Sequence, residues 1–110
     1  MIKKLLFILF LFNITYSFSQ EKSITQLSAA PNPFITSTEI HFNANQAGII
    51  IFNVKNILGK TVHKKQLFVQ KGENTISFFK QQLLPGIYIY SIQNKKSIVS
   101  KRLVIQGVKI

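Results

Sequence analysis

The sequence predicts an all-β protein, an immunoglobulin-like antiparallel β-sandwich of about seven strands preceded by a cleaved signal peptide. Three observations lead to this fold class. Apolar and polar residues alternate at period two in short runs, turn-forming residues recur about every 8 to 12 positions, and no stretch keeps helical spacing for long. The 110 residues suffice for one domain, and 46% hydrophobic with 15% charged residues is the composition of a folded protein.

The N-terminus has the three-part layout of a secretory signal peptide. Lys3 and Lys4 give a positive start, residues 5–12 are continuously apolar, and Ser17 and Ser19 are small residues at the spacing that signal peptidase requires. An uncleaved membrane anchor is the competing interpretation, but a membrane span needs about 20 apolar residues and this run is much shorter. We therefore expect export across the inner membrane.

Cleavage before Gln20 divides the chain into three segments. Residues 1–19 are the signal peptide, residues 20–26 are a short polar lead-in, and residues 27–110 are the sandwich domain. No transmembrane span is expected after the signal peptide is removed.

The expected strands follow one another with short breaks. Residues 48–54 form the most apolar run, in which Ile49 and Ile51 face away from Ile50 and Phe52, and this pattern predicts a central strand with little solvent on either face. In chain order the strands are 24–29, which is the weakest, 38–42, 48–54, 61–69, 74–78, 86–93 and 97–105. The side chains expected to be chiefly buried are Phe34, Ile40, Phe42, Ile50, Phe52, Val54, Ile76, Phe78, Leu84, Tyr88, Tyr90 and Leu103.

Residues with special backbone preferences mark the breaks between strands. Glycine supplies positive φ, asparagine tolerates it, and proline fixes φ near the value that many turns require. The predicted breaks are Asn56 to Gly59, Lys71-Gly72-Glu73, a crossover loop at 81–84 with room for one helical turn, Pro85-Gly86, and Asn94-Lys95-Lys96.

Acidic and thiol side chains, which most enzymes and metal sites need, are scarce. The chain has only three acidic residues, all glutamates, and no Cys. This excludes disulfides and thiolate chemistry, and it leaves too few carboxylates for a catalytic dyad, a Ser/His/Asp triad or a calcium cage. His41 and His63 lack a third ligand nearby and are expected to face solvent. We therefore expect no enzymatic activity, no cofactor and no metal.

Five short motifs follow one another in a fixed order along the chain. They are PNPF (Pro31, Asn32, Pro33, Phe34), a strand ending in ILGK with Gly59, Gly72 followed by Asn74, LPGIY with Leu84, Gly86 and Tyr88, and a closing KRLVI with Lys101 and Arg102. None is specific alone, but the ordered set resembles the type A C-terminal sorting domain of the Bacteroidetes type IX (Por) secretion system. The resemblance covers residues 27–105.

The resemblance implies a function for these motif residues. They would form a folded surface that an outer-membrane translocon reads. In many members a cell-surface sortase then removes the domain and joins the cargo to an anionic lipopolysaccharide. The implied fate is passage through the periplasm, followed by secretion or display at the cell surface.

The motifs also have structural uses of their own. Pro31 and Pro33 have no N–H group, so PNPF is expected to be an edge or turn segment that directs Phe34 into the end of the sandwich. Gly86 would let the chain enter the last hairpin. Tyr88 would bury its ring while its hydroxyl reaches a backbone carbonyl at the sandwich corner.

The chain is strongly basic, with a net charge of +11. Basic pairs stand at Lys64-Lys65, Lys95-Lys96 and Lys101-Arg102. Two interpretations stay open: attraction to an anionic partner at the cell envelope, or lysines that protect edge strands from pairing with other chains. A nucleic-acid partner is not expected, because the aromatic side chains are predicted to lie in the core rather than on a stacking platform.

The function class is not settled by these patterns alone. The expected cleavage site lies close to PNPF, so no cargo domain is expected between them. A free-standing sorting module, a very short surface peptide and the remnant of a truncated secreted protein all fit. A small exported surface or periplasmic module for binding or adhesion, without a sorting role, is the alternative from another class.

Overall fold

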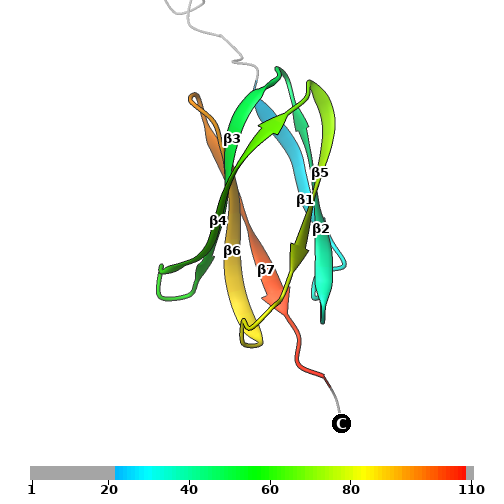
Figure 1. The fold of residues 1–110 in the computed structure, drawn as a ribbon, viewed down its shortest axis with the longest axis vertical. Helices are drawn as coiled ribbons and strands as arrows, with labels where there is room; N and C mark the ends of the chain where they lie inside the picture. Colours follow the sequence, from blue (N-terminus) through cyan, green and yellow to red (C-terminus); the bar gives the residue numbers. More distant parts are fainter. Residues whose placement is uncertain (1–21, 109–110) are drawn as a thin grey trace, which may run out of the picture.

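The computed structural model describes residues 22–108, which form two antiparallel β-sheets packed face to face (Figure 1). One sheet has three strands in the order β1-β2-β5, and the other has four in the order β4-β3-β6-β7. The predicted all-β sandwich is confirmed, and the predicted signal peptide lies outside the described residues. The strands are β1 (Ile24–Ala30), β2 (Ser37–Ala44), β3 (Gly48–Asn56), β4 (Thr61–Val69), β5 (Gly72–Phe79), β6 (Gly86–Gln93) and β7 (Ile98–Ile105).

The predicted first strand begins at Ile24 as expected, so it overlaps the stretch assigned to the lead-in. Two local expectations are changed by the structure. β3 is central in its sheet, but Ile49 is 56% exposed, because a two-layer sandwich leaves the outer face of each sheet in solvent. Residues 81–84 form a turn without a helix, and within residues 22–108 no helix has the length and apolarity to cross a membrane.

The core is a continuous apolar layer between the two sheets. The side chains predicted to be buried are buried, except Ile76, which is half-buried, and Leu84, which is exposed. Phe78 packs edge-on against Phe52 and Phe34, with ring centroids 5.8 and 6.1 Å apart respectively. Since Phe34 belongs to PNPF, this motif is anchored in the core at Phe34, while Pro31, Asn32 and Pro33 are exposed.

His63 is half-buried on β4, which corrects the expectation that it faces solvent. It pairs with Val54, a fully buried residue, so both point to the inner face of the sheet. Its ring lies edge-on to Phe78 and Phe52, at centroid distances of 5.2 and 5.6 Å. Burial, and after it the charge of Lys65, lowers the pKa of His63.

Both edge strands of the four-stranded sheet carry a lysine on their inner face. Lys65 on β4 is the register partner of Phe52, and Lys101 on β7 is the partner of Tyr90. Register partners share a face, yet both lysines are exposed because their strands are the outermost ones. An inward-pointing charge at a sheet edge opposes pairing with another chain, which supports the edge-protection interpretation for these two lysines.

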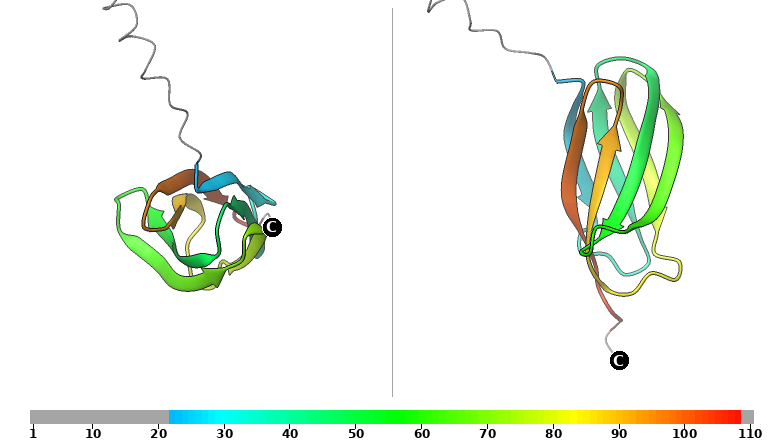
Figure 2. Two further views of the ribbon diagram at one scale, coloured as in Figure 1. Left: turned by 90° about the horizontal axis from the view of Figure 1, so that it is seen from above. Right: turned by 90° about the vertical axis from the view of Figure 1, so that its left-hand side faces the viewer.

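The sandwich has two ends, which we call poles (Figures 1 and 2). The C-terminal pole consists of residues 31–36, 56–60, 80–85 and 106–108, and β7 ends there. The opposite pole consists of Ser23 and the loops 45–47, 70–71 and 94–97, and β1 starts there.

Candidate recognition surface

PNPF runs beside the last residues of β7. The Phe34 N–H donates to the Val104 carbonyl at 3.0 Å, and the Gln106 N–H donates to the Phe34 carbonyl at 2.8 Å. Phe34 and Ile105 thereby form a parallel β-bridge, and Phe34 is 1% exposed. The expectation that PNPF directs Phe34 into the end of the sandwich is confirmed.

The side chain of Asn32 continues this ladder toward the start of β7. Its Nδ2 donates to the Arg102 carbonyl at 3.0 Å, and its Oδ1 accepts from the Val104 N–H at 3.0 Å. A primary amide offers a donor and an acceptor side by side, as a backbone peptide does on a strand edge. Asn32 therefore supplies one donor and one acceptor beside two prolines that have no N–H group, and it covers the edge of β7 from Arg102 to Val104.

Thr38 fixes the other side of PNPF, a role that the sequence analysis missed. Its hydroxyl donates to the Pro31 carbonyl at 2.6 Å, and the residue is 2% exposed. The only signal for it in the sequence is a polar residue at an inward position next to Ile40, which a strand pattern treats as an interruption.

LPGIY forms the second part of the C-terminal pole. The Tyr88 hydroxyl donates to the Leu84 carbonyl at 2.6 Å, and Tyr88 is 7% exposed, as expected of a tyrosine at a sandwich corner. Gly86 has φ of 155°, a value that L side chains rarely adopt. Gly86 and Tyr88 are the register partners of Ile105 and Leu103, so this motif lies directly beside β7.

Leu84 does not enter the core, which corrects the prediction that it is buried. Its side chain is 76% exposed, while the neighbouring Leu83 packs against the core. The Tyr88 hydroxyl fixes the Leu84 carbonyl, so the backbone at Leu84 is held and its side chain is left in solvent. In an irregular loop, alternation no longer indicates which of two leucines points inward.

Gly107 is a further residue of this pole that the sequence motifs did not indicate. A Cβ built at Gly107 would lie 3.6 Å from Cγ of Pro85, so the chain after β7 passes close over the proline of LPGIY. PNPF, LPGIY and the end of KRLVI thus meet at one place.

The two turn glycines lie at different ends of the domain. Gly59 has φ of 85° in the turn between β3 and β4, at the C-terminal pole, where the Asn56 side chain accepts bonds from the Leu58 and Lys60 N–H groups at 3.0 Å each. Gly72 has φ of 102° at the start of β5, beside the opposite pole. The structure therefore brings four of the five motifs to one end and leaves Gly72 at the other.

Lys101 and Arg102 are both exposed but face different ways. Arg102 is the register partner of Ile89, which is 40% exposed on the outer face of the four-stranded sheet, whereas Lys101 shares the inner face with Tyr90. The four strands of this sheet contain four lysines and Arg102 but no acidic residue. The described glutamates, Glu39 and Glu73, both belong to the other sheet.

Exposed apolar side chains gather at the C-terminal pole, next to the basic four-stranded sheet. Solvent-exposed hydrophobic groups that gather at one end of a small domain indicate an interaction surface. These side chains are Ile35 (47%), Ile57 (75%), Leu58 (88%), Leu84 (76%) and Val108 (68%).

These features are those of an interaction domain, because its folded surface is basic on one side and apolar at its tip. Among residues 22–108, no group of three or more His, Cys, Asp and Glu side chains could hold a metal ion. A family model of the secretion system C-terminal sorting domain matches residues 28–106, and the chain belongs to this Por-type family. A search of curated proteins finds no match.

Family membership confirms the resemblance to the type A sorting domain of the type IX secretion system. The domain has a sorting role, which implies contact with the secretion machinery and a secreted or cell-surface fate.

Proposed function

We propose that this chain is a non-catalytic targeting module whose C-terminal pole, together with the adjoining edge of β7, is the surface that the type IX translocon binds. The observation that carries this proposal is the pair of hydrogen bonds from Asn32 to the backbone of Arg102 and Val104. They place PNPF against KRLVI, so the composite surface exists only in the folded domain. A linear signal, by contrast, is also present in the unfolded chain.

The charge and apolarity of the surface support a protein partner with an acidic groove. Arg102 on the outer face and Leu84 and Val108 at the tip are all exposed. Complementary charge would steer the encounter, and burial of apolar side chains would hold the complex.

Two processing steps complete the proposed pathway. Signal peptidase removes residues 1–19 during export across the inner membrane, and Gln20 becomes the first residue. At the cell surface, a sortase then processes the domain, with attachment to anionic lipopolysaccharide, as in many members of the family. N-terminal mass spectrometry of the exported protein tests the first step, and retention of Lys3 and Lys4 would refute it.

An export experiment tests the proposed function. Residues 20–110 are fused to a periplasmic reporter that does not reach the surface alone, and surface reporter is measured. Deletion of residues 101–110 removes Arg102 and the part of β7 that PNPF and LPGIY pair with, so we expect export to be lost. Because this deletion also disrupts folding, the Asn32→Ala variant is measured in parallel and is expected to reduce export while it stays folded.

Surface display of both variants at the level of the unchanged domain would contradict the proposal. The small exported binding or adhesion module would then be the better interpretation of this sandwich.

A further inference from the structure

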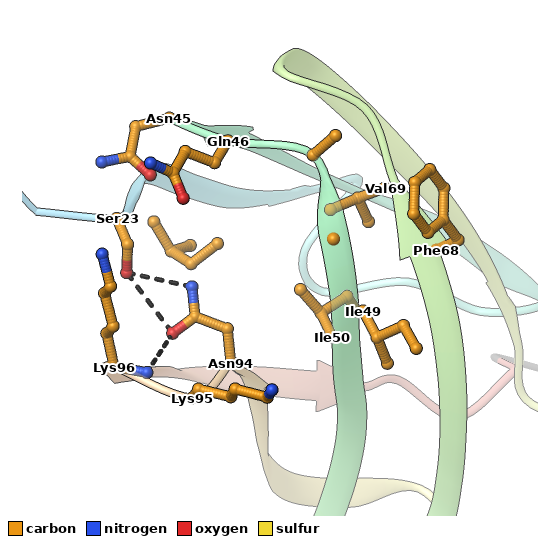
Figure 3. A pocket seen from close by; sticks show the side chains of 13 residues that line it. Ser23, Asn45, Gln46, Ile49, Ile50, Phe68, Val69, Asn94, Lys95 and Lys96 are labelled. Atoms are coloured by element: carbon orange, nitrogen blue, oxygen red, sulfur yellow. Dashed lines mark hydrogen bonds between the residues drawn. The ribbon is translucent and has the colours of Figure 1, made fainter.

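A groove of about 480 Å³ opens at the opposite pole, away from the motif residues (Figure 3). It lies between the start of β1, the loop 45–47, the end of β4 and the hairpin between β6 and β7. Its volume is in the range of sites that hold small molecules. None of the motifs PNPF, LPGIY and KRLVI contributes a residue to the groove, so the groove is separate from the proposed translocon surface.

The walls of the groove differ in chemistry. Ile24, Ile50 and Val69 are core residues that close its floor, whereas Ile49 and Phe68, 56% and 66% exposed, are its accessible apolar side chains. Figure 3 shows Ile50 from β3 and Phe68 and Val69 from β4 on one side, and a polar group with Ser23 and Asn94 on the other.

The polar side is rigid because its members bond to one another. Asn94 Nδ2 donates to Ser23 Oγ at 3.0 Å, and Asn94 Oδ1 accepts from the N–H groups of Lys96 and Ser97 at 2.9 and 2.8 Å. These bonds hold the hairpin tip beside the start of β1. Lys95 and Lys96 are thereby fixed at the groove, with exposed side chains.

The charge at the groove has one sign. Lys95 and Lys96 line it, and none of its described lining residues is acidic. An apolar depth beside two ammonium groups complements a molecule with a hydrocarbon chain and an anionic head. A neutral apolar molecule would leave the lysines unused, and a cationic one would be repelled.

We propose that this groove binds a single-chain anionic amphiphile, with its alkyl chain in the open space beside Gly48 and Phe68 and its carboxylate or phosphate head beside Lys95 and Lys96. The inference does not depend on the sorting role, because the groove and the recognition surface lie at opposite poles.

Gly48 offers a way to fill the groove without strain. It lines the groove, and a Cβ built on it meets no atom within 4 Å. Gly48 also lies two residues before Ile50 on β3, so a side chain there points to the same face as Ile50. A phenylalanine at this position would occupy the space proposed for the alkyl chain.

The test is a titration with octyl phosphate of a chain that starts at Gln20 and so contains every described residue. Two-dimensional amide NMR monitors the binding. We expect saturable, one-to-one shifts at the amides of Ala47 to Ile50, Phe68 and Asn94 to Lys96. The double change Lys95→Gln with Lys96→Gln should raise the Kd roughly tenfold. Gly48→Phe should abolish saturable binding, and its matched control Gly48→Ala should bind as the unchanged protein does.

Three controls decide between this ligand and other occupants. Octylammonium has the same chain and the opposite charge, and it should not saturate the groove. Lys60→Gln with Lys80→Gln removes equal charge at the C-terminal pole, outside the groove, and should leave the Kd within about twofold. Amide spectra at two protein concentrations, without ligand, should coincide if no second copy occupies the groove.

Any of three results would overturn the proposal. They are equal binding of octylammonium, which means a nonspecific apolar contact; binding that survives Gly48→Phe in a folded protein; and the absence of saturable shifts at these amides with octyl phosphate.

Discussion

The Oδ1 atom of Asn32 accepts a hydrogen bond from the N–H of Val104 at 3.0 Å, although the two residues are 72 positions apart. This contact joins the segment that follows β1 to the strand that ends the domain. It covers the edge of β7 from Arg102 to Val104, and it builds the surface that we propose the translocon binds from segments near the two ends of the domain.

Loss of the Asn32 side-chain amide should lower the free energy of unfolding as well as reduce export. Asn32→Ala removes two hydrogen bonds that are partly accessible to water, so we expect the free energy of unfolding to fall by about 1–2 kcal/mol. Urea denaturation measures this loss. Gln66→Ala, at an exposed position on β4, is the matched control and should change stability by less than about 0.5 kcal/mol. Equal effects of the two substitutions would mean that the Asn32 bonds contribute nothing to stability.

Phe52 and Leu84 should differ sharply as truncation sites. Phe52 is 0% exposed and contacts Phe78 and His63, so Phe52→Ala should cost about 3–5 kcal/mol. Leu84 is 76% exposed, and Leu84→Ala should stay within about 0.5 kcal/mol. Denaturant midpoints of both variants check the pair. A loss under about 1 kcal/mol for Phe52→Ala would show that the inner face of β3 is assigned wrongly.

His63 should make stability depend on pH on the acid side of neutrality. Its pKa is lowered in the folded state by burial and by Lys65, so the unfolded chain binds the proton more readily. The contribution of His63 to the free energy of unfolding is therefore fully present above the ordinary pKa of 6.5, and it falls as the pH drops from 6.5 toward the lowered pKa. Thermal midpoints between about pH 7 and 5 measure it.

The control variants separate His63 from the other histidine. His63→Phe should flatten the pH dependence in this range, whereas His41→Gln, at an exposed position on β2, should keep it. A flat profile for the unchanged protein would contradict the burial of the His63 ring.

Gly59 and Gly48 should respond oppositely to alanine. Gly59 has φ of 85°, a left-handed value at which a Cβ is strained, so Gly59→Ala should cost about 1–2 kcal/mol. Gly48 begins β3 with no such φ and with open space around its Cβ, and Gly48→Ala should be neutral or stabilising by up to about 1 kcal/mol. Thermal unfolding of both variants decides it, and a neutral Gly59→Ala would contradict the turn geometry.

Lys101 and Arg102 should have separable roles. Arg102→Gln removes the outward charge beside Ile89 and should reduce surface display of a fused reporter several-fold, while stability stays within about 0.5 kcal/mol. Lys101→Gln removes an inward-facing edge charge and should instead increase self-association, which light scattering detects. Unchanged display for Arg102→Gln would mean that the translocon does not read this charge.

The sequence by itself determined the fold class, the strand order along the chain and ten of the sixteen buried apolar core residues in the described part of the chain. Side chains on a strand repeat every two residues. Alternation therefore places Phe52 and Val54 on one face of β3, and it places Tyr90 on the inward face of β6. The turn glycines were also predictable, since positive φ is a local property of the backbone. The ordered motifs were sufficient for the family.

Only the tertiary structure decided which motifs meet. No local rule indicates that Asn32 bonds to Val104, that Thr38 holds Pro31, or that Gly72 lies at the other end, because each depends on how the two sheets are stacked. The same holds for Leu84 and His63, which were assigned to the wrong side. The exposure of a loop side chain or an edge-strand ring is set by neighbours that are distant in sequence, and the periodicity of the chain carries no information about them.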